Sequence, residues 1–171
     1  MKNIFTILAL TIGFSMNAQM VDNSIGCSAT TLSVAMGYYT QANGSISTAM
    51  GYNTDAIGGA STAMGDNTQA FGGASTAMGR YTEASGNYST AMGYNTDAIG
   101  GASTAMGRST TASDYASLVI GQYNSSGSSA TSATAFSTAN TAFVIGNGVD
   151  GSNTSDAFKV MFNGDATLSN D

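Results

Sequence analysis

The sequence contains no histidine, no proline and no tryptophan, and its single cysteine is Cys27. Without histidine, the usual nucleophilic triads and zinc sites cannot be built. One cysteine cannot form an intrachain disulfide, so stability must come from packing or association. The absence of proline is expected where nearly every backbone amide donates to a neighbouring strand. We therefore predict a non-enzymatic chain with no cofactor and no metal site.

Positive charge is also scarce, because four Lys and Arg residues oppose ten Asp and Glu residues. The chain has no basic patch that could neutralise phosphates, which argues against nucleic acid and anionic lipid as partners. Asp55, Asp66 and Asp97 could suggest calcium, but acids do not recur in every repeat as a calcium-binding β-roll requires. Charged residues are only 8% of the chain, so its surface must consist mostly of hydroxyls and amides, as in repetitive extracellular β structures.

Long apolar runs are confined to the start of the chain. Lys2, the apolar residues 4–14 and the small residues up to Ala18 form the pattern of a secretory signal peptide. The alternative is a membrane anchor, but a run of about 11 residues is well short of the roughly 20 that span a bilayer. We expect cleavage after Ala18, a secreted product, and no transmembrane span in the mature chain.

Cys27 admits three interpretations. It is an incidental thiol, an interchain disulfide partner, or a lipoprotein acylation site, because residues 25–27 read Ile-Gly-Cys. Polar residues 22–24 separate this tripeptide from the apolar run, which disfavours acylation. The first two interpretations stay open.

The motif STAMG and its variants recur at an interval of 14 residues. They place glycines at Gly37, Gly51, Gly65, Gly79, Gly93, Gly107 and Gly121. A strict short period is typical of a solenoid, whose units bury their apolar faces by stacking. Each repeat holds two strand-like segments, as at residues 47–51 and 54–57, which predicts two sheets per coil. We expect glycine, Asn, Asp and Ser to provide the turns, where a positive φ is often required.

The second segment of each repeat has a polar column that we expect to face water. It consists of Gln41, Asp55, Gln69, Glu83, Asp97 and Thr111. Strand side chains alternate between faces, so the flanking Thr and Ala columns turn into the coil.

The first segment has an apolar column made of Met36, Met50, Met64, Met78, Met92, Met106 and Ile120. Alternation permits two arrangements. Either this column fills the coil of a monomer, or the alanines turn inward and the column forms an outward stripe too large for a soluble monomer to expose.

These repeats resemble the YadA-like head of trimeric autotransporter adhesins, whose 14-residue repeats carry a small-apolar-Ala-apolar-Gly core. Here that core reads SVAMG at residues 33–37, STAMG five times, and SLVIG at residues 117–121. The resemblance implies an all-β, left-handed parallel β-roll of 14-residue coils that forms a homotrimer, with the first strands facing the threefold axis. It therefore favours the outward arrangement and implies a trimer interface of Met36, Met50, Met64, Met78, Met92, Met106 and Ile120.

The resemblance also implies a function. Proteins of this kind are secreted or displayed on the outer cell surface, where they attach to host matrix, cells or biofilm polymers. Tyr52, Tyr81, Tyr94 and Phe71 are candidate ligand contacts, although for any one of them an ordinary solvated surface is the better explanation. The sequence departs from complete adhesins in that no heptad-repeat stalk is evident.

The repeat register breaks after Gly121. A Ser-, Thr- and Ala-rich stretch follows, and residues 142–148 and 156–164 have the pattern of strands that close the open end of a solenoid. We predict a signal peptide at 1–18, an N-terminal lead-in at 19–32, a head-repeat β-roll at 33–121, a Ser/Thr/Ala-rich loop at 122–141, and C-terminal capping strands at 142–171.

Two rival functions fit a regular β solenoid. Threonine columns spaced by about 4.8 Å suggest an ice-binding protein, but one such column is expected inside the coil and the other beside methionine. A phage-tail-fibre protein is the second rival, and the signal peptide argues against it because virion components assemble inside the cell.

Overall fold

The computed structural model describes residues 28–29, 32–127 and 130–169. The predicted signal peptide at residues 1–18 and Cys27 lie outside the described residues. Of the lead-in at residues 19–32, only Ser28, Ala29 and Leu32 are described. Among the described residues, no helix has the length and apolar character needed to cross a membrane.

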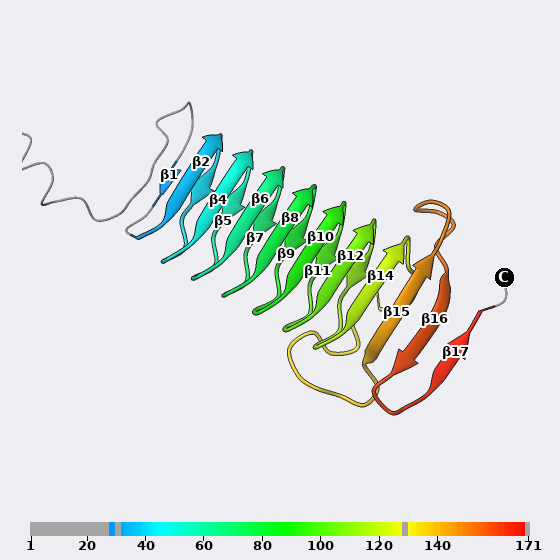
Figure 1. Ribbon diagram of the computed structural model, residues 1–171. Helices are drawn as coiled ribbons and strands as arrows, with labels where there is room; N and C mark the ends of the chain where they lie inside the picture. Colours follow the sequence, from blue (N-terminus) through cyan, green and yellow to red (C-terminus); the bar gives the residue numbers. More distant parts are fainter. Residues whose placement is uncertain (1–27, 30–31, 128–129, 170–171) are drawn as a thin grey trace, which may run out of the picture.

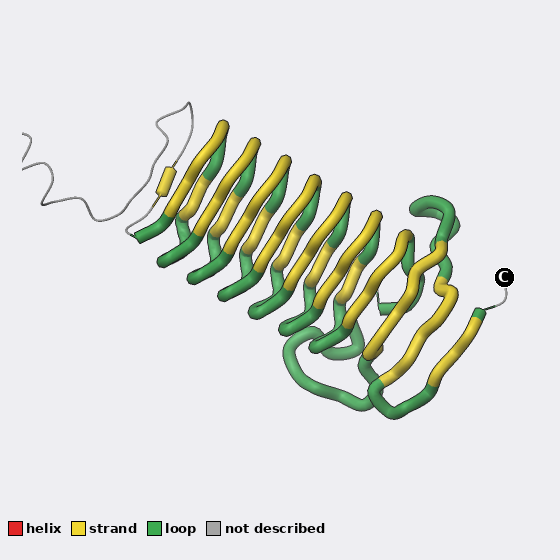
Figure 2. Tube along the Cα trace, in the orientation of Figure 1, coloured by secondary structure: helices red, strands yellow, loops and turns green. Residues whose placement is uncertain are grey.

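The described chain winds into a β-solenoid of about six turns with a 14-residue period and no helix (Figures 1 and 2). The prediction of an all-β solenoid is confirmed. Each coil contributes one strand to each of two sheets. The repeat strands of the first sheet are β2 (Val34–Tyr38), β4 (Thr48–Tyr52), β6 (Thr62–Asp66), β8 (Thr76–Arg80), β10 (Thr90–Tyr94), β12 (Thr104–Arg108) and β14 (Leu118–Gln122).

The second sheet consists of two-residue strands. They are β1 (Ser28–Ala29), β3 (Gln41–Ala42), β5 (Asp55–Ala56), β7 (Gln69–Ala70), β9 (Glu83–Ala84), β11 (Asp97–Ala98) and β13 (Thr111–Ala112). All these strands pair in parallel, and all except β1 pair in the 14-residue register, so that Met64 lies opposite Met50 on one side and Met78 on the other. Equivalent residues therefore form straight columns along the rod.

The interior of the solenoid is thin and filled by small side chains. Alanines from both sheets and Val119 have no exposed surface: Ala35, Ala42, Ala49, Ala56, Ala63, Ala70, Ala77, Ala84, Ala91, Ala98, Ala105 and Ala112. The Thr column of the second segment is equally buried, for example at Thr54 and Thr82, so it cannot contact ice. Of the two arrangements that alternation permits, the molecule has the one with alanines inside and methionines outside.

Positive φ angles occur at glycines and at other turn residues, as we expected for glycine and Asn. Gly51 (φ 132°) and Asn53 (φ 50°) are examples, whereas the alanine corners, such as Ala60 (φ 55°), were not expected. By contrast, Gly72 has no positive φ, but a Cβ there would overlap the backbone carbonyl of Gly86 in the next coil. Many of the glycines are thus required by the close stacking of coils rather than by turn conformation.

The solenoid ends in a change of strand direction. Strand β15 (Thr141–Asn147) pairs in parallel with β14, whereas β16 (Asp156–Met161) and β17 (Ala166–Leu168) each pair antiparallel to the strand before. This turn away from the coil path is visible at the lower right of Figure 1. Because the parallel repeat stops here, no further coil can be added in register.

The segment between β14 and β15 is tied to the last coil by one buried carboxylate. Asp114 has no exposed surface and accepts backbone N–H bonds from Thr131 (2.5 Å), Ser132 (3.2 Å) and Thr141 (2.7 Å). The carbonyl of Ser132 in turn accepts from the amide of Tyr115. This segment is therefore an ordered part of the fold, and sequence reasoning did not identify Asp114 as its anchor.

Candidate functional site

The outward side of the first sheet carries what we call the methionine face. It consists of Met36, Met50, Met64, Met78, Met92, Met106 and Ile120, each aligned with the next by the parallel register. Met36 and Met106 are 37% and 38% exposed, and the other five are partly buried by their neighbours in the column. The structure thus brings all seven predicted interface residues together in one line.

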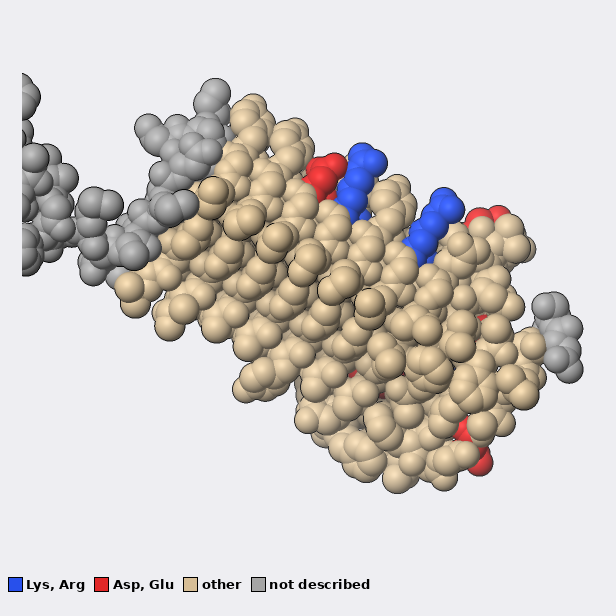
Figure 3. All heavy atoms as spheres, in the orientation of Figure 1, with Lys and Arg blue, Asp and Glu red and all other residues tan. Residues whose placement is uncertain are grey.

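Glycines beside the methionines leave a shallow depression along this face. One part of this depression has a volume of about 450 Å³ and is lined by Met36, Met50, Met64 and the glycines that follow each of them. Figure 3 views the molecule from this side and shows no charged side chain over the middle of the repeat strands. An uncharged, apolar face of this length has the properties of a protein contact surface.

A second surface, the polar-aromatic edge, lies where the strands of the first sheet end. Its residues follow the repeat glycines and are Tyr38, Tyr39, Tyr52, Asn53, Asp66, Asn67, Arg80, Tyr81, Tyr94, Asn95, Arg108, Ser109 and Tyr123. The charged side chains visible over the solenoid in Figure 3 gather along its upper edge. Since charges, amides and phenols recur along this edge, it differs sharply from the methionine face.

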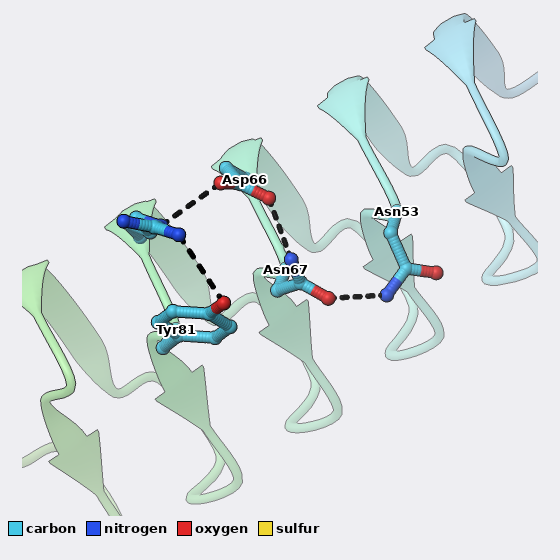
Figure 4. A network of polar contacts seen from close by, with 5 residues as sticks. Asn53, Asp66, Asn67 and Tyr81 are labelled. Atoms are coloured by element: carbon cyan, nitrogen blue, oxygen red, sulfur yellow. Dashed lines mark hydrogen bonds and ion pairs between the residues drawn. The ribbon is translucent and has the colours of Figure 1, made fainter.

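A hydrogen-bonded chain crosses three coils of this edge (Figure 4). Arg80 Nε lies 3.0 Å from Asp66 Oδ2, and Asp66 Oδ1 accepts a hydrogen bond from Asn67 at 2.6 Å. Asn67 accepts from Asn53 at 2.6 Å, and Arg80 also donates to the Tyr81 hydroxyl at 3.3 Å. These exposed bonds contribute little to stability, but they hold the side chains in one arrangement.

Aromatic contacts order the tyrosines of the edge. The rings of Tyr38 and Tyr52 stack at 5.5 Å, and Tyr81 meets Tyr94 edge to face at 6.0 Å. The Arg80 guanidinium lies 4.7 Å from the centre of the Tyr81 ring. Of the four candidate contacts, Tyr52, Tyr81 and Tyr94 share this edge, whereas Phe71 follows β7 at a different corner of the coil.

Beside this edge lies a polar hollow that we call the tyrosine groove. It has a volume of about 320 Å³ and is lined by Asn53, Asn67, Gln69, Tyr81, Thr82, Glu83, Asn95 and Asp97. Partial burial raises the pKa of Asp97 above its usual range, and the charge of Glu83 raises it further. Sequence reasoning missed this groove, although the recurring asparagines Asn53, Asn67 and Asn95 were a signal that could have indicated it.

The aspartates considered for calcium do not gather in one place. Asp66 is paired with Arg80 on the edge, whereas Asp55 and Asp97 lie on the second sheet. Burial raises the pKa of Asp55, and a hydrogen bond from Gln69 opposes the shift. Within the described ranges, no group of three or more His, Cys, Asp or Glu residues could hold a metal ion.

A stacked β-solenoid with an apolar outer stripe and a polar edge defines the class of protein, a β-solenoid repeat protein. A family model described as "YadA head domain repeat (2 copies)" matches residues 31–54, 56–82, 72–96 and 98–124. These matches cover more than half of the sequence, so the chain belongs to the YadA head repeat family, as the repeat motif predicted. No curated protein matches the chain. YadA head domains belong to cell-surface adhesins, and YadA-like heads form trimers.

Proposed function

We propose that this chain forms a left-handed homotrimeric head, secreted or displayed on the outer cell surface, that attaches to host matrix, cells or biofilm without enzymatic activity. The observation that carries the proposal is the methionine face. A solenoid whose interior is already filled by alanine, serine and threonine has no internal use for seven aligned apolar side chains. Membership of a family whose heads form trimers supports the same conclusion.

The energetics favour association through this face. Complete burial of a methionine contributes about 1.5–3 kcal/mol relative to full exposure. Because Met36 and Met106 are only 37% and 38% exposed and the others less, covering each side chain adds at most roughly 0.5–1 kcal/mol. The neighbouring column, which includes Val34 and Leu118, adds further apolar area on the same side.

The regular register suits a threefold arrangement. Every coil presents the same residues at the same height, so three copies turned about one axis match along the whole length of the rod. Such a ring closes on itself and leaves the second sheet and the polar-aromatic edge available for ligands. A trimeric rod of this kind provides three copies of any binding surface, which raises the overall strength of attachment.

The test of assembly compares two matched substitutions in the mature chain. Met78→Asp places a charge in the middle of the methionine face, whereas Ile99→Asp makes the same kind of change at a 41% exposed corner that follows strand β11. We expect sedimentation velocity to show a smaller particle for Met78→Asp only. Equal sedimentation of the two variants would contradict the proposed interface.

The test of attachment uses beads coated with the mature chain. We expect them to be retained on extracellular matrix, cultured cells or biofilm more strongly than beads coated with an unrelated protein. Absence of retention on all three surfaces would contradict the proposed role.

A further inference from the structure

We propose that the tyrosine groove binds an uncharged, hydroxyl-rich glycan chain, with a sugar ring against Tyr81 and hydroxyl groups bound by Asn53, Asn95 and Asp97. This inference rests on the proposed function, because it names the chemical class of ligand for an attachment protein. It concerns a surface separate from the methionine face.

The groove offers several hydrogen-bond acceptors. Asn53 and Asn95 each donate one amide N–H, to Asn67 and Ser109 respectively, and their carbonyl oxygens are left for a ligand. Within the described part of the chain, the Asp97 carboxylate accepts no hydrogen bond from another residue. Because acceptors in a partly buried groove favour a ligand rich in donors, a chain of sugar hydroxyls meets this requirement.

An aromatic ring stands beside these acceptors. Tyr81 is 43% exposed, the Arg80 guanidinium lies 4.7 Å from the centre of its ring, and the Tyr94 ring lies nearly perpendicular to it at 6.0 Å. A ring that is already ordered loses little conformational freedom when a ligand packs on it. The apolar C–H face of a pyranose packs on an aromatic ring, while its hydroxyls point outward to polar neighbours. The pairing of one tyrosine with amides and carboxylates therefore fits a sugar.

The repeat favours a polymer over a single sugar. Successive coils are spaced by about 4.8 Å, and one wall of the groove presents Asn53, Asn67 and Asn95 at three levels of the rod. The other wall presents Gln69, Glu83 and Asp97 at successive levels. Polar groups that recur in a line can bind similar units of a linear chain, so a glycan lying along the rod contacts several coils.

Charge selects among glycans. Glu83 and Asp97 line the groove, and the nearby cation Arg80 is paired with Asp66. An anionic polysaccharide would bring more negative charge toward these carboxylates and toward a chain of net charge −6. The ligand class is therefore uncharged.

The experiment measures binding of the whole mature protein to defined probes by isothermal titration calorimetry and NMR line broadening. The uncharged probes are hexasaccharides of glucose, mannose and N-acetylglucosamine, the anionic probe is a hyaluronan hexasaccharide, and calcium chloride is titrated alone. We expect at least one uncharged hexasaccharide to bind, and neither hyaluronan nor calcium to do so. Failure of every uncharged probe, or binding of hyaluronan or calcium at equal affinity, overturns the proposal.

Variants locate the site. We expect Tyr81→Ala to weaken binding at least tenfold and Asp97→Asn at least threefold, whereas Tyr81→Phe retains the ring and most of the affinity. Tyr88→Ala is the matched control, because Tyr88 is 73% exposed at a different corner. This variant should bind the hexasaccharide with the affinity of the wild type. Unchanged affinity in both Tyr81→Ala and Asp97→Asn overturns the proposal. If Tyr81→Ala fails to fold, the affinities of Asp97→Asn and Tyr88→Ala for the hexasaccharide are compared instead. Equal affinities of these two variants overturn the proposal.

The bead assay separates this inference from the proposed function. If Tyr81→Ala remains trimeric and its beads attach as well as the wild type, the groove proposal fails and the adhesin function stands. If wild-type beads attach to nothing while the protein still binds a hexasaccharide through Tyr81, the adhesin function fails and the groove proposal stands.

Discussion

At the scale of single residues, the solenoid depends on how closely neighbouring coils approach one another. Gly72 is typical, because a Cβ at this position would overlap backbone atoms of Gly86 in the next coil. The backbone N–H groups of Gly72 and Gly86 donate to the carbonyls of Ala84 and Ala98 in the next coils, so neither glycine can move away at low cost. Because glycine lacks a Cβ, neighbouring coils can stack at the close spacing that the rest of the rod has.

Gly72→Ala isolates this effect from conformational strain, because Gly72 has no positive φ. We expect it to lower the free energy of unfolding by more than about 2 kcal/mol. Gly151→Ala is the control, since Gly151 has no positive φ and a Cβ there meets nothing within 4 Å. Thermal and urea unfolding measure the difference. Equal stability of the two variants would show that the coils can separate more easily than the structure indicates.

Two aspartates should respond to pH in opposite directions. The pKa of Asp97 is raised by burial and by Glu83, so the folded state binds this proton more tightly than the unfolded state. Its contribution to stability therefore improves as pH falls from the raised pKa toward the ordinary value of 3.8. Asp97→Asn should have a higher Tm than the wild type at neutral pH, and the difference should shrink on acidification.

Asp150 is the matched control for this prediction. Hydrogen bonds from the backbone of Ser152 and from Asn153 lower its pKa, so it stabilises the folded state above its ordinary pKa and this contribution is lost as pH falls. Asp150→Asn should therefore lower the Tm at neutral pH. Tm values measured from pH 7 to pH 3 test both signs, and shifts of the same sign in the two variants would contradict them.

At the scale of elements, the segment between β14 and β15 is held by a carboxylate rather than by an apolar cluster. The buried Asp114 side chain binds the backbone amides of Thr131, Ser132 and Thr141. Hydrogen bonds from neutral donors to a buried charge are worth about 1.5–3 kcal/mol each. This single side chain therefore connects the last regular coil to the strands that terminate the solenoid.

Asp114→Asn should release this segment, because an amide nitrogen cannot accept the hydrogen bonds that a carboxylate oxygen does. We expect faster amide hydrogen exchange at residues 131–141, with little change at residues 48–98. Asp165→Asn, at an exposed turn, should leave both regions unchanged. Unaltered exchange at residues 131–141 in Asp114→Asn would contradict the anchoring role.

The elements also show how far the sequence could predict the structure. The 14-residue period predicted the coil and its two sheets, because each repeat holds two alternating segments. Alternation could not decide whether alanine or methionine faced inward, since both arrangements satisfy it. Asp114 could not be identified because its partners lie 17 to 27 residues away. The tyrosine groove was missed because its walls come from two different sheets.

At the scale of the whole molecule, the rod has one uncharged apolar side and one polar edge. The interior is complete without the methionines, so the methionine face needs another surface to cover it. In the trimer that we propose, that surface is the same face of two other chains, and the polar-aromatic edge stays exposed. Assembly and attachment therefore use different columns of one repeat.

The mass of the wild-type mature protein in solution tests the central claim most directly. Static light scattering coupled to size-exclusion chromatography gives this mass without assumptions about shape, which matters for an elongated rod. We predict three times the mass of one chain over a tenfold range of concentration. A mass equal to that of one chain would contradict the account.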